Sequence, residues 1–240
     1  MISAIVTAYE RVDQTLATLR IIQSCVPSPD EVLVHVDANQ VECENAIRDA
    51  FPEVRILRSD NHVGPGGGRN KLLNAAQSEF VASFDDDSYP IDSDYFARAL
   101  TLCNRFPDAS VICATLYHSH EPIALDDQRA QWTADFSGGA CIFRRDAFLE
   151  AGGYVPLPVA YGMEEVDLAI RLHAQNKKIL TTPWLRVFHN TDLKRHGDPG
   201  VTAGSIANLA LRRGRFKIEK SLNISAHSNS RLLLLSFYAN

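Results

Sequence analysis

Three consecutive aspartates, Asp85, Asp86 and Asp87, follow an apolar run at residues 79–84. Carboxylates about 4 Å apart repel each other by roughly 4 kcal/mol at an effective dielectric constant of 20. In an extended backbone Asp85 and Asp87 point to one face and Asp86 to the other. Mg²⁺ commonly binds carboxylate and phosphate oxygens together. The spacing therefore favours a divalent-cation site for a nucleotide diphosphate, and a solvated turn is the alternative.

A glycine-rich segment at residues 61–70 precedes a helix that we expect to begin at Arg69. Its glycines are Gly64, Gly66, Gly67 and Gly68. Backbone amides at a helix N-terminus, beside Arg69 and the following Asn70, suit a diphosphate. The dinucleotide fingerprint G-x-G-x-x-G is excluded, because the first strand–helix turn lacks it and the sixth position counted from Gly64 is Arg69. A Walker loop is absent as well.

Apolar runs alternate with amphipathic stretches through the first half of the chain. We expect strands at residues 2–7, 31–37, 53–59, 79–84 and 109–117, and helices at 11–25, 41–51 and 93–106. Repeated strand–helix units with continuous Val, Ile and Leu strands predict an α/β fold with a mostly parallel central sheet flanked by helices. Ligands of such sheets bind beyond the carboxyl ends of the strands. The three aspartates would lie at that edge.

The second half is less regular. Two extended segments around the Gly138–Gly139 turn are expected within residues 130–148, and an amphipathic helix at 164–178. No repeat or linker divides the chain, so we expect one domain over residues 1–240. Its nucleotide-binding half would span about 1–117, its acceptor-facing half about 118–191, and a helical tail about 192–240.

Composition narrows the function classes. The net charge is −5 and the pI about 5.9, which argues against a nucleic-acid partner. The five cysteines are an odd number without a C-x-x-C pair, which is typical of buried thiols in a reducing compartment. The first residues lack signal-peptide features, and no apolar run is long enough to span a membrane. A cytoplasmic protein is expected.

Taken in order, the segments resemble the inverting glycosyltransferases of family 2, which have the GT-A fold and a DXD-type motif. The matching segments are IVTAYER, VLVHVDANQ, NHVGPGGGRNKLLNAA, FVASFDDDSYP, DFSGGACIFRRDAFLEAGGY, GMEEVDLAIRLHAQNKKI and VFHN, over roughly residues 2–190. FDDDSYP and the triple-glycine segment look like the rhamnosyl- and galactofuranosyl-transferase branches. The resemblance implies transfer of a sugar from a nucleoside-diphosphate sugar to a hydroxyl of a saccharide or lipid-linked glycan, in bacterial surface polysaccharide synthesis.

The resemblance also assigns nucleotide and metal positions. It implies that the segment Thr7, Ala8 and Tyr9, with Glu10 or Arg11, cradles the base, that Asp37 touches base or ribose, and that Gly67, Arg69 and Asn70 line the nucleotide. Asp85 or Asp86 would hold the ribose or donor sugar. Asp87 would bind Mg²⁺ or Mn²⁺ together with His189, and Asp85 is a further ligand candidate because it shares a face with Asp87. For His189 the alternative is a buried, hydrogen-bonded imidazole.

Catalysis and the sugar pocket are assigned to the second half. The resemblance places Glu165 at the catalytic-base position, with Glu164 as the alternative. Without it, these acids are simply favoured in the first turn of a helix by about 0.3 to 1 kcal/mol. Gly138 and Gly139 would allow close backbone approach to the donor sugar. Trp132 would either line that pocket or pack in the core.

Two other functions remain open from the sequence: a sugar-phosphate nucleotidyltransferase of related fold, and a non-catalytic domain that binds sugar nucleotides or glycans. The basic segment at residues 209–220 is either a solvated helix face or a peripheral contact with the inner face of the cell membrane. The sequence indicates no oligomeric state.

Overall fold

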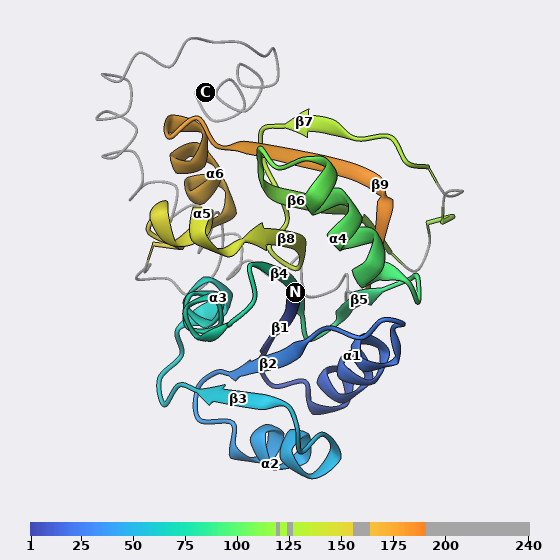
Figure 1. Cartoon of the computed structure of the whole chain (residues 1–240). Coiled ribbons are helices and arrows are strands. Elements are labelled where there is room, and N and C mark those ends of the chain that lie inside the picture. Colours follow the sequence, from blue (N-terminus) through green and yellow to red (C-terminus); the bar gives the residue numbers. More distant parts are fainter. Residues whose placement is uncertain (119–120, 124–126, 156–163, 191–240) are drawn as a thin grey trace.

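The computed structural model describes residues 1–118, 121–123, 127–155 and 164–190. They form a nine-stranded sheet with helices on both faces (Figure 1). In the first half β1 (Ile2–Ala8), β2 (Glu31–Val36), β3 (Arg55–Arg58) and β4 (Phe80–Asp85) are parallel, in the order β3-β2-β1-β4. The connecting helices are α1 (Val12–Ser24), α2 (Val41–Ala50) and α3 (Gly64–Ala75). The predicted strand–helix units are confirmed.

The second half makes the sheet mixed. The strand order continues β8-β6-β9-β5, and β7 (Gln131–Thr133) pairs with β9 (Lys178–His189). β8 (Ala140–Arg144) is antiparallel to β4 and to β6 (Ala109–Tyr117), β6 is parallel to β9, and β5 (Ser88–Pro90) is antiparallel to β9. The helices here are α4 (Tyr95–Arg105), α5 (Arg145–Glu150) and α6 (Glu164–Ala174). The predicted α/β fold is confirmed.

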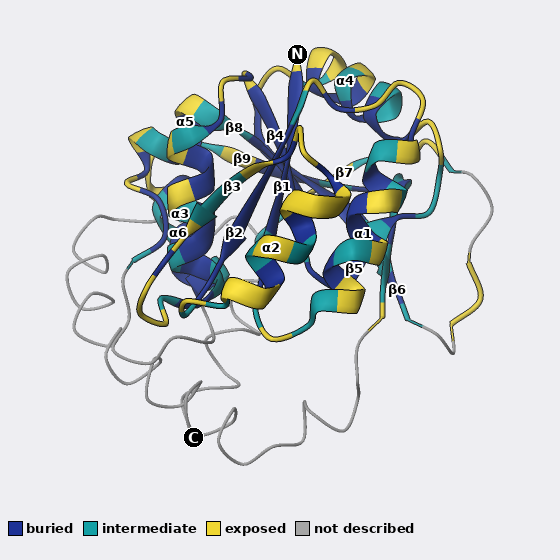
Figure 2. Cartoon of the chain, turned by 90° about the horizontal axis from the view of Figure 1, so that it is seen from below, coloured by how far each residue is buried: buried dark blue, intermediate teal, exposed yellow. Residues whose placement is uncertain are grey.

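Burial on both faces explains the continuous apolar strands. One hydrophobic cluster packs α1, α2 and α4 on the sheet, through residues such as Leu19, Ile47 and Phe96. The other packs α3, α5 and α6 on the opposite face, through residues such as Leu72 and Phe148. Figure 2 shows the strands buried between helices whose outer faces are exposed. All five cysteines are buried and free, as expected.

Helix α3 begins at Gly64, five residues before the predicted start at Arg69, so Gly66, Gly67 and Gly68 lie inside the helix and do not form a preceding loop. Gly64 itself has a left-handed φ of +71°. A Cβ atom on Gly68 would lie 2.5 Å from Nδ1 of His35 on β2. Glycine therefore lets the helix approach the sheet closely. Pro65 at the first turn and Asp37, which accepts hydrogen bonds from the backbone of Val63 and Gly64, fix the earlier start.

No helix within the described ranges is both long and apolar enough to cross a bilayer. The predicted C-terminal tail, with its basic segment at 209–220, lies outside the described residues.

Candidate active site and metal centre

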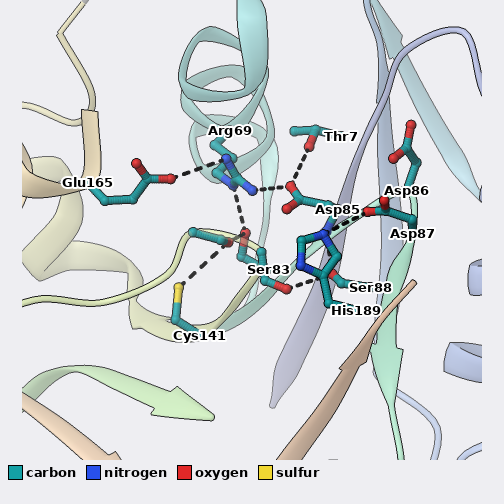
Figure 3. Close-up of polar contacts among 12 residues, drawn as sticks. Thr7, Arg69, Ser83, Asp85, Asp86, Asp87, Ser88, Cys141, Glu165 and His189 are labelled. Atoms are coloured by element: carbon teal, nitrogen blue, oxygen red, sulfur yellow. Dashed lines mark hydrogen bonds and ion pairs between the residues drawn. The ribbon is translucent and has the colours of Figure 1, made fainter. Parts of the chain in front are cut away.

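The carboxyl ends of the parallel strands bring the predicted site residues together. Thr7 at the end of β1 is in register with Asp85 at the end of β4, and its Oγ1 lies 3.4 Å from an Asp85 oxygen. His189 ends β9 and is in register with Ser88, directly after the aspartates. The backbone N–H of the following residue, Asn190, donates to the Asp87 carbonyl at 2.8 Å. Segments about 100 residues apart in the sequence therefore converge here (Figure 3).

Asp85, Asp87 and His189 form a group that could hold a metal ion. Each offers one ligand atom, and these atoms lie within 4.8 Å of one another. Asp87 Oδ1 is buried 3.2 Å from Nε2 of His189, and no well-aligned hydrogen-bond donor reaches it within the described part of the chain. Two carboxylate oxygens and an imidazole nitrogen suit Mn²⁺, and the carboxylates suit Mg²⁺. The residues therefore fit the predicted ion.

The charges of this group are mutually dependent. Burial raises the pKa of Asp87, but the contacts with His189 and Arg11 outweigh burial and hold it below its ordinary value. Burial lowers the pKa of His189, and the Asp87 contact outweighs that effect, so the pKa of His189 is raised. Asp87 is therefore more readily ionised than a free carboxyl, and His189 holds a proton more readily than a free imidazole.

Asp86 points away from this group (Figure 3). It is 2% exposed, and it accepts a hydrogen bond from the backbone N–H of Tyr9 at 3.2 Å and a two-pronged ion pair from Arg11. Burial raises its pKa to about 7, partly opposed by Arg11. Asp86 and Asp87 lie in the turn between β4 and β5, so the extended backbone on which the predicted alternation rested is wrong at these two residues. Asp85 and Asp87 still share the ion site, and Asp86 anchors the loop that was expected to cradle the base.

Arg69 is the buried centre of the site. Its guanidinium forms an ion pair with Asp85, donates to Ser83 Oγ at 3.1 Å, and lies 4.0 Å from Glu165 Oε1 (Figure 3). Burial alone would lower its pKa, but the surrounding groups, Asp85 first, raise it, so Arg69 stays charged. A fixed cation therefore stands between a metal-ligand candidate and the predicted base.

Two serines that the sequence analysis did not single out hold the Gly138–Gly139 turn. Ser83 Oγ donates to the Gly138 carbonyl and Ser88 Oγ to the Gly139 carbonyl, each at 2.6 Å. The signal was present, because Ser83 is a polar residue inside a buried apolar strand. A buried hydroxyl there needs a partner.

The two glycines let the backbone lie close to the charged side chains of the site, and their predicted approach to the donor sugar stays a prediction. A Cβ on Gly138 would lie 2.7 Å from Glu165 Oε1 and 2.9 Å from the Arg69 guanidinium carbon. A Cβ on Gly139 would overlap Oδ2 of Asp85. Any larger residue would therefore displace the acidic side chains of the site.

The two glutamates at the start of α6 face different surroundings. The Glu165 side chain is 25% exposed and faces Arg69. Burial and, after it, the charge of Glu164 raise the pKa of Glu165 to about 7. Glu164 is 4% exposed and packs where a Gly66 side chain would stand, and its Oε2 has no hydrogen-bond partner among the residues described. Glu165 is thus the glutamate that reaches the open part of the site.

Several predicted nucleotide residues have structural partners. Asp37 accepts from three backbone amides, those of Ala38, Val63 and Gly64, and lies 2.9 Å from His62 Nδ1. Asn70 pairs both amide atoms with the backbone of Tyr154 at 2.8 Å. Ala8 is buried at the end of β1, and Gly67 lies inside α3. Their contacts with a nucleotide stay predictions.

Trp132 does not line the site. It is 51% exposed on β7, which pairs with residues 179–181 at the beginning of β9, whereas His189 is at the other end of that strand. Its ring meets Phe106 edge-on at 6.3 Å, and Lys178 lies over it at 5.1 Å. Both alternatives are wrong: sheet pairing places Trp132 at the end of β9 opposite His189, and its exposure excludes it from the core.

Comparisons with known proteins agree with this architecture. The model of the family "Glycosyl transferase family 2" matches residues 3–152. No match was found among curated proteins. A mannosyltransferase from Pyrobaculum calidifontis in complex with GDP-Man and Mn²⁺ aligns with a TM-score of 0.66 at 17% identity, over 80% of this chain and 57% of that one.

Two further solved structures are similar. GalNAc-T7 with UDP, GalNAc and Mn²⁺ gives a TM-score of 0.68 at 13% identity, over 86% of this chain and 47% of that one. Residues 1–349 of TarS from S. aureus with UDP-GlcNAc give 0.61 at 14%, over 82% of this chain and 61% of that one. At these identities the likeness shows the fold alone, and the chain spans about half to three fifths of the length of these proteins. From the family model, which matches more than half of the sequence, the chain belongs to glycosyl transferase family 2.

Proposed function

We propose that this protein is a metal-dependent, inverting glycosyltransferase that moves a sugar from a nucleoside-diphosphate sugar to a hydroxyl group of a saccharide or lipid-linked glycan. The observation that carries the proposal is the arrangement of Asp85, Asp87 and His189 at one side of Arg69, with Glu165 at the other. A site for an ion that binds a diphosphate and a base that can accept a hydroxyl proton therefore lie on the two sides of Arg69.

Glu165 is proposed as the general base. The acceptor oxygen attacks the anomeric carbon and its proton passes to the Glu165 carboxylate, while the bond from the anomeric carbon to the diphosphate oxygen breaks and the nucleoside diphosphate leaves. A base is most effective when its pKa lies near the working pH, and the pKa of Glu165 is about 7. Arg69 holds Glu165 and Asp85 on either side of one fixed charge.

Asp85, Asp87 and His189 would hold Mg²⁺ or Mn²⁺. When bound, such an ion would offset the negative charge that develops on the leaving diphosphate. Asp87 supplies a buried oxygen for it. Because residue 139 is glycine, no side chain there displaces Asp85. The base-cradling role proposed for Thr7, Ala8, Tyr9 and Arg11 is supported by the fixed position of that loop against Asp86.

Rhamnose or galactofuranose as the donor sugar, and a bacterial surface polysaccharide as the product, are supported by the resemblance of FDDDSYP and the triple-glycine segment to those branches. The similar structures carry GDP-Man, UDP or UDP-GlcNAc, so both guanosine and uridine donors belong in any screen. We also propose that the chain acts as one domain, with a nucleotide-binding half up to about residue 117.

A screen of sugar nucleotides tests the proposal. Nucleoside diphosphates at 100 times their dissociation constant add about 2.7 kcal/mol of stability, which raises the melting temperature of a protein of this size by roughly 5 to 10 °C. We expect the rise only with Mn²⁺ or Mg²⁺, and release of nucleoside diphosphate from one sugar nucleotide when an acceptor is added. Consumption of a nucleoside triphosphate with a sugar phosphate would instead identify a nucleotidyltransferase, and binding without turnover a non-catalytic domain.

A further inference from the structure

We propose that Arg11 is a positioning residue for the metal centre: it holds the Asp87 carboxylate so that a single oxygen, Oδ1, faces the ion site. The inference rests on the proposed function, because it concerns the ion that Asp85, Asp87 and His189 would hold. It adds a residue from the first strand–helix loop, which the sequence analysis assigned only to the nucleotide base.

The contacts of Arg11 leave it little freedom. Its guanidinium reaches Asp87 Oδ2 through Nη1, and both oxygens of Asp86 through Nη2 and Nε. Asp86 is itself fixed, because it accepts from the Tyr9 backbone N–H at 3.2 Å and its carbonyl accepts from Thr18 Oγ1 at 2.8 Å. Arg11 also directly precedes α1, which ties its backbone to the helix. Paired charge-assisted hydrogen bonds of this kind set geometry as well as energy.

The two oxygens of Asp87 therefore have different surroundings. Oδ2 is taken by Arg11, whereas Oδ1 lies 3.2 Å from His189 Nε2 and has no well-aligned hydrogen-bond donor in the described ranges. The side chains of Asp86 and Asp87 are each only 3% exposed, so water cannot replace a lost partner freely. If Arg11 were absent, the Asp87 carboxylate could turn, and Oδ1 would no longer be held toward the ion site.

A purely electrostatic role for Arg11 predicts the opposite effect. A guanidinium beside the site repels a divalent cation, so its removal by charge alone would strengthen ion binding. A positioning role predicts weaker binding, since loss of a group that orients a metal ligand typically costs 10- to 100-fold in metal affinity. The sign of the change therefore decides between the two roles.

The experiment measures Mn²⁺ binding to the full chain by electron paramagnetic resonance of the free ion, with Mn²⁺ alone and then with UDP or GDP present. We expect Arg11→Met to weaken binding about tenfold or more. Arg11→Lys should also weaken it, because one ammonium keeps the charge but cannot bridge two carboxylates. Arg20→Met, at an exposed position in α1, the helix that Arg11 precedes, is the matched control and should bind Mn²⁺ like the wild type.

Unchanged or tighter binding by folded Arg11→Met would overturn the inference while leaving the proposed function intact. Circular dichroism checks folding, and if Arg11→Met does not fold, Arg11→Lys decides: unchanged affinity refutes positioning, since lysine keeps the charge but loses the bridge to both carboxylates. Absence of Mn²⁺ binding in the wild type, with and without nucleotides, would refute both the inference and the metal-dependent function. Asp87→Ala, which removes a ligand side chain, shows the signal expected when Mn²⁺ binding at this site is lost.

Discussion

Replacing Glu165 by Gln should make the free protein more stable at alkaline pH while abolishing transfer. Glu165 is a partly buried carboxyl beside Glu164, and its pKa is raised from the ordinary 4.5 to about 7. Its ionised form is therefore disfavoured in the folded protein. Gln has nearly the same shape and carries no charge, so it removes this penalty and the proton-accepting group together.

The magnitude follows from linkage. A pKa difference of about 2.5 corresponds to roughly 3 kcal/mol. Below pH 4.5 both the folded and the unfolded chain hold the proton, so Glu165 does not lower the stability of the wild type. Between pH 4.5 and 7 the unfolded chain releases it first, so wild-type stability falls, and above pH 7 the penalty is constant. Since a quarter of the side chain stays exposed, we expect Glu165→Gln to gain about 1 to 3 kcal/mol at pH 8 and almost nothing at pH 4.

Urea unfolding followed by circular dichroism at several pH values measures this gain. Glu42→Gln, at an exposed position in the first turn of α2, is the control: it should lose no more than about 1 kcal/mol, the helix-dipole contribution, and should gain no stability at pH 8. A Glu165→Gln variant that is no more stable than the wild type at pH 8, or whose gain does not change with pH, would refute the raised pKa of this carboxyl.

Three further predictions concern the same site and its support. The transfer rate should rise with pH through about 7, because Glu165 must be ionised to accept a proton; a rate that is flat from pH 5.5 to 8.5 would contradict this. Gly139→Ala should displace Asp85 and weaken Mn²⁺ binding in titrations, whereas intact affinity would mean that the backbone yields. Gly68→Ala should cost about 1 to 3 kcal/mol in chemical unfolding, through the 2.5 Å approach to His35, and a neutral change would show that α3 can move.

The first four strands and their helices could be predicted because their signals are local. Val, Ile and Leu runs repeat with amphipathic stretches between them, and polar residues mark each strand end. The convergence of Asp85, Asp87 and His189 was also predicted, although it joins distant segments; the family resemblance supplied His189, and strand pairing between β5 and β9 realises it.

What sequence reasoning missed depends on side-chain partners that are distant in the sequence. The early start of α3 follows from Asp37, 27 residues away, accepting from the Gly64 amide. Trp132 was a sugar-pocket candidate because an aromatic ring close to glycines suggests one, but pairing of β7 with the first residues of β9 carries it to the far edge. The bridge from Arg11 to Asp86 and Asp87 spans 75 and 76 residues, and no local pattern indicates it.

The most direct test of the metal-and-diphosphate site is calorimetric titration of the wild type and Asp87→Ala with UDP, GDP and dTDP and the matching sugar nucleotides, with and without Mn²⁺. We predict that one base class binds the wild type, that binding requires the ion, and that Asp87→Ala loses the ion-dependent part. If the wild type shows no heat of binding with any of these ligands in the presence of Mn²⁺, or if Asp87→Ala binds them as the wild type does, the acidic strand end is not a sugar-nucleotide site.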